Sequence, residues 1–183
     1  LASSLAATKR RVLLVDLDPQ GNATMGCGVD KNAQSRTSCE VLLGDCAAME
    51  ALVQVEYGGF MLMPANQDRT AAEVRLLGMI TGREFKLPNA LKPVRDAFDV
   101  ILIDCPPALN MLTLNALVAA DSVMVPMQCE YYALEGLSAL VQTIEQIRAS
   151  INADLEIEGL LRTMFDPRNN LSNEVSAQLI EHF

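Results

Sequence analysis

The stretch Arg11–Gly28, "RVLLVDLDPQGNATMGCG", decides the fold class, because an apolar run in it ends in two aspartates, Asp16 and Asp18, and three glycines follow. A run this apolar is typical of a strand that is buried on both faces of a parallel sheet. Ionised carboxylates at the edge of an apolar core are costly unless a cation or hydrogen-bond donors compensate them. The two aspartates therefore predict a functional edge where this strand ends.

Further elements extend outward from this strand in both directions. Comparable apolar runs lie at residues 98–104, 121–127 and 154–165, with a weaker one at 58–65. Segments of helical period lie at residues 1–7, 37–43, 69–77, 90–97, 109–119 and 134–149. Strands that alternate with helices predict an α/β fold, a mostly parallel sheet with helices on both faces. Since no linker is long enough to divide the chain, we expect a single domain over residues 1–183.

Composition excludes several functional classes. No tract of about 18 apolar residues occurs, so no membrane span is predicted. The formal net charge of −9 means that any binding of nucleic acid needs a local basic face. The five cysteines form no C-x-x-C pair and His182 is the one histidine, which argues against a Cys/His zinc site. Unpaired cysteines without a signal peptide indicate a cytoplasmic protein.

A second buried strand, at residues 98–104, ends in Asp104, which is followed by Cys-Pro-Pro. Ligands of α/β sheets bind at the carboxyl ends of the strands, so we expect Asp16, Asp18 and Asp104 at one edge. Such acids commonly hold Mg²⁺, often through water, beside a triphosphate. Each aspartate alone could instead cap a turn or a helix.

A phosphate-binding loop of the form G-x-x-x-x-G-K-[ST] does not occur within the 183 residues. The stretch "GNATMGCG" has Gly21 and Gly26 at the required spacing, but Cys27 and Gly28 stand where Lys and Ser/Thr are needed. We interpret this stretch as a flexible loop after the strand, with Asn and Thr side chains as available polar contacts.

Three longer segments carry a family resemblance. They are "KRRVLLVDLDPQGNATMGCGVD" (9–30), "FDVILIDCPPALNMLTLNALVAADSVMVPMQCEYYALEGLSALVQTI" (98–144) and "GLLRTMFDPRNNLSNEV" (159–175). In this order they resemble the ParA/Soj partition ATPases, a deviant Walker-motif group that also contains MinD and the nitrogenase iron protein. The resemblance covers nearly the whole chain and implies a P-loop NTPase-like fold.

The resemblance also implies an ATP hydrolase that uses ATP and Mg²⁺. Family members carry a loop resembling KGGVGKTT just before the first helix, so we expect the chain to be truncated at both ends. We expect this polypeptide alone to bind ATP poorly or not at all. Asp18 would orient or activate the attacking water and serve the metal, Asp104 would hold Mg²⁺ through water, and Asp16 would support the metal and phosphate side.

Further residues receive roles by resemblance. The implied nucleotide contacts outside the acidic strands are Gln128, Glu130, Thr163, Met164 and Asp166. Arg168 corresponds to an arginine of the family's nonspecific DNA-binding surface. From the sequence alone, Arg168 is equally an exposed loop arginine.

The function implied by the resemblance is DNA partition. Such a protein forms a homodimer with ATP, binds nonspecific DNA and is stimulated by a ParB-like partner. We expect it to be cytoplasmic, associated with the nucleoid, and without stable membrane association.

Three alternatives stay open. The first is a MinD-like positioning ATPase recruited to membranes, although MinD-like chains usually follow the Asp-x-Asp with Ile-Gly-Leu, whereas this chain has "DLDPQGN". The second is a degenerate, non-catalytic module. The third, an electron-transfer protein like the nitrogenase iron protein, needs cysteines in glycine-rich surroundings, which Cys105 and Cys129 lack.

Overall fold

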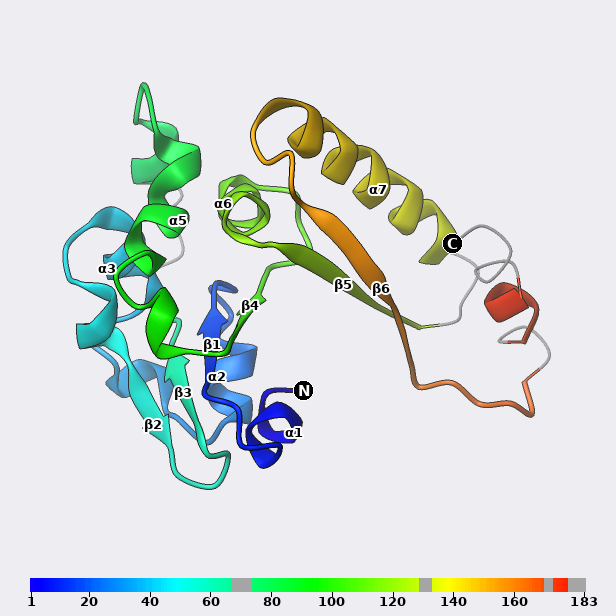
Figure 1. Cartoon of the computed structure of the whole chain (residues 1–183), viewed down its shortest axis with the longest axis horizontal. Helices are drawn as coiled ribbons and strands as arrows, with labels where there is room; N and C mark the ends of the chain where they lie inside the picture. The colour runs from blue at the N-terminus through cyan, green and yellow to red at the C-terminus, as the bar shows by residue number, and fades with distance from the viewer. Residues whose placement is uncertain (67–73, 129–132, 170–172, 178–183) are drawn as a thin grey trace. The chain divides into compact units, whose positions relative to one another are not determined.

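The computed structural model describes residues 1–66, 74–128, 133–169 and 173–177. The chain divides into two compact units, Leu1–Ala119 and Ala120–Phe183 (Figure 1). A single domain over residues 1–183 stays a prediction.

The first unit contains a four-stranded sheet in the order β2-β3-β1-β4. Its strands are β1 (Val12–Asp16), β2 (Val53–Val55), β3 (Phe60–Met63) and β4 (Val100–Asp104). Strand β1 pairs in parallel with both β3 and β4, while β2 runs antiparallel to β3. The mostly parallel sheet confirms the predicted fold class.

Helices cover both faces of this sheet, as the sequence predicted. They are α1 (Ala2–Ala7), α2 (Asn22–Gly26), α3 (Ser38–Leu43), α5 (Lys86–Leu91) and α6 (Met111–Ala119), and residues 74–77 are also helical. Short 3₁₀ turns lie at Lys31–Ala33, Ala48–Ala51, Arg83–Phe85 and Arg95–Ala97. Because side chains alternate along β1, Leu13 and Val15 pack with α3, α5 and α6, whereas Val12 packs with α1.

Two local predictions differ from the structure. The stretch interpreted as a flexible loop after β1 contains the helix α2, because a buried side chain of β1 binds its first turn. The helix predicted over residues 90–97 is instead α5, which begins at Lys86. Pro88 falls in the first turn of α5, where its missing N–H removes no intrahelical bond.

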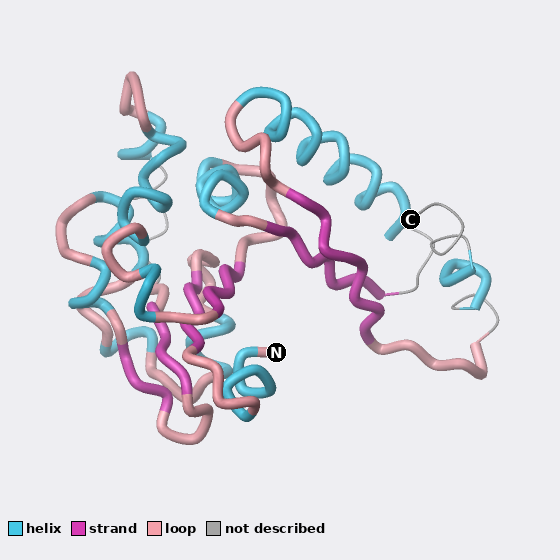
Figure 2. The backbone as a smooth tube through the Cα atoms, in the orientation of Figure 1, coloured by secondary structure: helices cyan, strands magenta, loops and turns pink. Residues whose placement is uncertain are grey.

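The second unit contains β5 (Ser122–Gln128), β6 (Glu156–Thr163) and the long helix α7 (Ala133–Ser150) (Figure 2). The two strands are parallel, and Met127 and Leu137 belong to one buried cluster between strand and helix. The sequence predicted burial on both faces of β5, but alternate side chains along the strand, including Met124, are exposed. Within the described residues, no helix has the length and apolar character needed to cross a bilayer.

Candidate functional site

The parallel register of β1 and β4 aligns their last residues, so Asp16 lies opposite Asp104. Asp18 follows Asp16 by two residues. The three carboxylates therefore occupy the same edge of the sheet, which we call the acidic edge. This is the edge where ligands of parallel α/β sheets bind. The roles given to these residues above remain predictions.

Asp16 is fully buried, and its carboxylate binds the protein itself. Oδ1 accepts the backbone N–H of Asp18 at 3.0 Å, and Oδ2 accepts the backbone N–H and the hydroxyl of Thr24 at 2.8 and 2.7 Å. Burial raises the pKa of Asp16, while the hydrogen bonds from Thr24 and Asp18 oppose that shift. Asp16 therefore fixes the turn that presents Asp18, with few acceptor positions left for a ligand.

The same edge is joined to neighbouring elements by further hydrogen bonds. The hydroxyl of Ser38, at the start of α3, donates to the carbonyl of Asp16 at 2.6 Å. The hydroxyl of Thr24 accepts the N–H of Ala65 at 3.0 Å, just after β3. The N–H of Leu17 donates to the carbonyl of Asp104 at 2.8 Å. The sequence identified Thr24 only as an available polar contact and did not identify Ser38, because nothing local marks a hydroxyl that bonds a residue far along the chain.

Asp18 is half-buried and differs from Asp16 in its bonding. Its Oδ1 accepts the N–H of Gln20 at 2.9 Å, and its carbonyl accepts the N–H of Gly21 at 2.8 Å. Gly21 adopts a positive φ of 63°, which turns the chain into α2. Among the described residues no donor reaches Oδ2 of Asp18, so that oxygen is available to a ligand.

Asp104 ends β4 with an exposed carboxylate, to which no donor within the described ranges is hydrogen-bonded. Its partial burial among protein atoms raises its pKa, and the negative charges of Asp16 and Asp18 raise it further. The three acids therefore interact electrostatically. A cation at this edge would relieve their mutual repulsion.

The donor set fits a hydrated magnesium ion. Across residues 1–66, 74–128, 133–169 and 173–177, no group of three His, Cys, Asp or Glu side chains is close enough to hold a metal directly. Mg²⁺ usually keeps several waters and binds one or two carboxylates together with phosphate oxygens. Asp104 and Asp18 can supply such contacts through water.

The loop that follows Asp104 is fixed to α6. Oδ1 of Asn110 accepts the N–H groups of Leu112 and Thr113 at 3.0 and 3.1 Å, which caps the helix. The hydroxyl of Thr113 donates to the carbonyl of Ala108 at 2.7 Å. The sequence contains a signal for this cap, because Asn110 directly precedes the apolar helix.

The second unit holds the other predicted nucleotide contacts. Gln128 and Thr163 are register partners at the ends of β5 and β6, and the amide of Gln128 lies 3.2 Å from the sulfur of Met164. Met164 is 85% exposed and has a positive φ of 52°. The structure thus brings Gln128, Thr163 and Met164 together at one strand end. Glu130 lies outside the described residues.

Asp166 and Arg168 form an exposed ion pair. The guanidinium of Arg168 donates to both carboxylate oxygens of Asp166, at 3.0 and 2.9 Å, and its backbone N–H donates at 2.9 Å. These contacts lower the pKa of Asp166. A ligand that binds either side chain competes with this pair.

Comparisons with known proteins agree with this architecture. A family model described as an AAA domain matches residues 1–157. The chromosome partitioning protein ParA of Myxococcus xanthus is 49% identical over 183 residues, which span 100% of this chain and 64% of that protein. The sporulation initiation inhibitor protein Soj of Bacillus subtilis is 43% identical over 183 residues, spanning 100% of this chain and 72% of that protein.

A solved structure is similar over the same range. It is the crystal structure of cobyrinic acid a,c-diamide synthase from Mycobacterium smegmatis with bound ATP analog and magnesium. The two chains are 43% identical with a TM-score of 0.93, and the match covers 100% of this chain and 74% of that one.

Proposed function

The chain belongs to the ParA/Soj family of chromosome-partitioning ATPases, and from this membership we propose that it hydrolyses ATP with Mg²⁺ in DNA segregation. The observation that supports this proposal most directly is the alignment of Asp16 with Asp104 at the edge where Asp18 also lies. The solved structure that binds an ATP analog and magnesium supports the choice of cofactors.

In this proposal the three aspartates have different tasks. Magnesium, when bound, supplies positive charge that neutralises the phosphates during transfer. Asp104 holds the ion through its water shell, and Asp18 orients the attacking water with its free carboxylate oxygen. Asp16 keeps Asp18 in place through the bond from the Asp18 N–H. The 183 residues contain no G-x-x-x-x-G-K-[ST] loop. The proposal therefore gives none of these residues the role of a phosphate-binding loop of that type.

In the same proposal the second unit supplies further nucleotide contacts, with the adenine base near residues 163–166. Gln128, Thr163 and Met164 lie together at the carboxyl ends of two parallel strands, the usual position for ligand contacts. Asp166 and Glu130 are the remaining candidates from the family resemblance.

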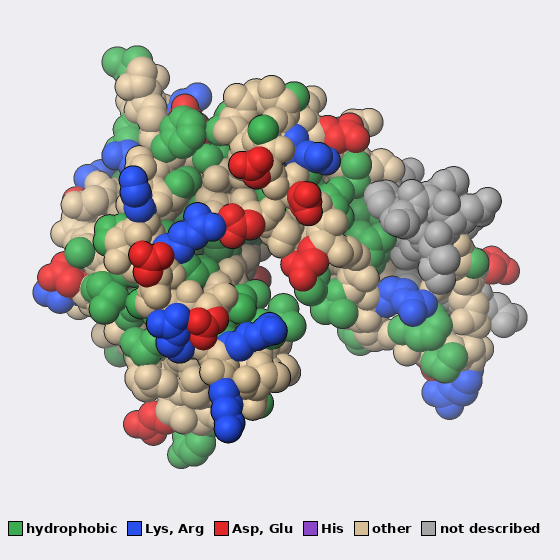
Figure 3. Space-filling view, viewed as in Figure 1, with side chains coloured by type: hydrophobic (Ala, Val, Ile, Leu, Met, Phe, Trp, Pro, Cys, Tyr) green, Lys and Arg blue, Asp and Glu red, His purple; other side chains and the backbone are tan. Residues whose placement is uncertain are grey.

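We further propose that the intact protein forms a homodimer with ATP, binds nonspecific DNA at the nucleoid and is stimulated by a ParB-like partner. Figure 3 shows basic and acidic side chains interspersed over the visible face of the first unit, without one large basic field. With a net charge of −9, DNA affinity must then come from a few positions such as Arg168, doubled by dimerisation.

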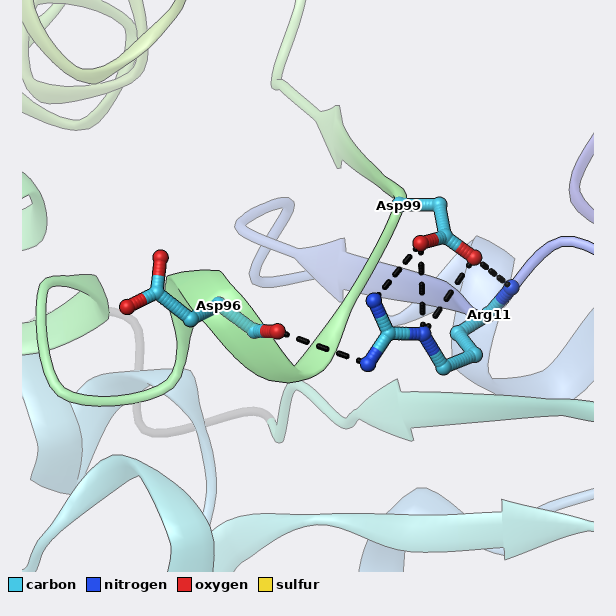
Figure 4. A network of polar contacts seen from close by, with 3 residues as sticks. All are labelled: Arg11, Asp96 and Asp99. Carbon is cyan, nitrogen blue, oxygen red and sulfur yellow. Dashed lines mark hydrogen bonds and ion pairs between the residues drawn. The ribbon is translucent and has the colours of Figure 1, made fainter.

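The test is turnover by the intact protein. We expect Mg²⁺-dependent ATP hydrolysis that rises when nonspecific DNA and the ParB-like partner are added together. Asp104→Asn should lower turnover by about 10²-fold, because it removes the charge that holds the ion. Asp96→Asn is the matched control, since only the carbonyl of Asp96 is bonded in the network of Figure 4. Equal turnover in both variants would contradict the proposal.

A second candidate function is ATP-dependent amide formation, favoured by the likeness to cobyrinic acid a,c-diamide synthase. It predicts that turnover requires a carboxylic acid acceptor and an ammonia donor, and that DNA has no effect. Hydrolysis stimulated by DNA without any acceptor would exclude it.

A further inference from the structure

Thr24 is a fully buried residue of α2 to which the proposed reaction gives no task. Its hydroxyl makes two hydrogen bonds of opposite sense. It donates to Oδ2 of Asp16 at 2.7 Å and accepts the backbone N–H of Ala65 at 3.0 Å. A hydroxyl can do both, because it carries a proton as well as lone pairs. Thr24 therefore joins the carboxylate at the end of β1 to the chain just after β3.

The backbone of Asp16 is held independently of Thr24. Asp16 is the last residue of β1 and lies in register with Asp104 of β4. Its carbonyl accepts the hydroxyl of Ser38 at 2.6 Å, and Ser38 is itself buried. The freedom left to Asp16 is rotation of its carboxylate, a torsion with only broad intrinsic preferences. Hydrogen bonds must therefore set the direction in which the two carboxylate oxygens point.

Three donors set that direction. They are the N–H of Asp18 on Oδ1, and the N–H and hydroxyl of Thr24 on Oδ2. The two N–H groups belong to the turn and the helix that this carboxylate itself holds, so they move with the segment they would have to fix. The hydroxyl differs from them because it is also bonded to Ala65, outside that segment. Thr24 is thus the donor that ties the carboxylate to the sheet.

Loss of the hydroxyl would affect both of its partners. The N–H of Ala65, a buried residue, would lose its acceptor, and buried donors are costly to leave unpaired. The carboxylate of Asp16, bonded to the same hydroxyl, is a strong acceptor for that N–H. A rotation toward Ala65 weakens the bond between Oδ1 and the N–H of Asp18. The turn that presents Asp18 would then be less well fixed.

We propose that Thr24 is a positioning residue for ATP hydrolysis. Its hydroxyl holds the carboxylate of Asp16 in the orientation that accepts the N–H of Asp18, and so keeps Asp18 where it orients the attacking water. The effect on the turn stands on the hydrogen bonds alone, whereas the effect on turnover rests on the proposed ATPase function. The competing interpretation is that Thr24 only stabilises α2, and the experiments below separate the two.

The first experiment measures turnover and ATP affinity of the intact protein. Thr24→Val keeps the shape of the side chain and removes the hydroxyl. We expect kcat to fall about tenfold or more, because small errors in the placement of a catalytic group are costly. Equilibrium ATP affinity should change less than about threefold, because Asp18 acts on water in the transition state. Thr24→Ser, which keeps the hydroxyl, should recover most of the lost turnover.

Val12→Ala is the matched control for a loss of stability alone. Val12 is buried at the start of the same strand and packs with α1, away from the bonds of Asp16. Its truncation should lower the urea midpoint while kcat changes less than twofold. If Thr24→Val fails to fold, Thr24→Ala and Thr24→Ser provide the same comparison, since these two variants differ only by the hydroxyl.

The second experiment needs no nucleotide. Amide hydrogen exchange, measured by NMR on the nucleotide-free protein, reports how well the N–H of Asp18 is held. This N–H should exchange at least tenfold faster in Thr24→Val than in Val12→Ala, and Thr24→Ser should restore its protection.

The outcomes distinguish the positioning from the proposed function. Equal exchange at Asp18 in Thr24→Val and Val12→Ala would overturn the positioning, whether or not the protein hydrolyses ATP. Faster exchange together with equal kcat in these two variants would overturn the role of Thr24 in turnover. Absence of turnover in the wild-type protein would instead overturn the proposed function, and the exchange result would still decide the positioning.

Discussion

Asp16 and Asp18 are separated by one residue, yet their surroundings give them different tasks. Asp16 is fully buried and accepts three hydrogen bonds, whereas Asp18 keeps one carboxylate oxygen free of protein donors in the described chain. A sequence pattern alone cannot make this distinction, because both residues are acids at the end of the same apolar run. Substitution of Asp18 should therefore mainly lower turnover, whereas substitution of Asp16 should mainly lower stability.

Asp18→Ala in the intact protein should lower kcat by about 10² to 10⁴, the range for loss of a group that assists proton transfer. ATP affinity should change by less than about threefold, because the carboxylate acts on water in the transition state. Single-turnover hydrolysis and equilibrium ATP binding measure the two effects. Undiminished turnover would remove Asp18 from the mechanism.

Asp16→Ala should instead lower the free energy of unfolding by roughly 2–4 kcal/mol, because it leaves buried donors of Asp18 and Thr24 without an acceptor. Urea denaturation followed by circular dichroism measures the loss. Asp18→Ala is the natural comparison and should cost less than about 1 kcal/mol by the same measurement. Equal losses in the two variants would contradict the structural task given to Asp16.

Asp99 should make stability depend on pH in acid. Arg11 donates to it from its guanidinium at 2.6 Å and from its backbone N–H at 2.8 Å (Figure 4), which lowers the pKa of Asp99 from 3.8 to about 2. A depressed pKa contributes stability above pH 3.8 that is lost as the pH falls toward about 2. Denaturation midpoints should fall across this window less steeply in Asp99→Asn. Identical slopes would contradict the assignment.

At the scale of elements, the sequence predicted the helices and strands whose hydrophobic pattern is long and regular. Strands β1 and β4 and helix α6 lie close to their predicted positions. The helix predicted over residues 37–43 is α3, which begins with a capping box formed by Thr37 and Glu40. Strand β2 was missed, because three residues are too few to show an alternation. Helix α2 was missed because its stability comes from Asp16, a tertiary contact that propensity does not contain.

The chain enters α2 through Gly21. Replacing glycines near α2 by alanine can separate the cost of a left-handed backbone from the cost of a steric clash. Gly21→Ala forces a left-handed conformation on a residue with a Cβ and places that Cβ 2.8 Å from Cδ of Lys31. Gly28→Ala has the same conformational cost, with φ +77°, but meets nothing within 4 Å. We expect a loss of about 1 kcal/mol for Gly28→Ala and a larger loss for Gly21→Ala, measured by urea denaturation. Equal losses would show that Lys31 moves aside freely.

At the scale of the whole molecule, the predicted nucleotide contacts belong to two units that are each internally compact. The acidic edge lies within Leu1–Ala119, while Gln128, Thr163 and Met164 lie within Ala120–Phe183. The apolar strands alone predicted the acidic edge, whereas the contacts of the second unit were predicted from the family resemblance. The sequence could not predict the partners that hold these residues, such as Arg168 on Asp166, because exposed loop contacts leave no periodic signal.

In the proposed ATP-bound dimer, DNA binding should depend on Arg168, for whose guanidinium a phosphate competes with Asp166. Each phosphate contact contributes about −0.9 to the slope of log K against log salt, so loss of one arginine per subunit should make the slope less steep by about two. Arg168→Glu is compared with Arg148→Glu, which changes an exposed arginine in the last turn of α7. Fluorescence anisotropy with a labelled duplex at several salt concentrations measures both slopes. If the two variants give the same slope, the ion pair with Asp166 is the whole role of Arg168, and the DNA contact lies elsewhere.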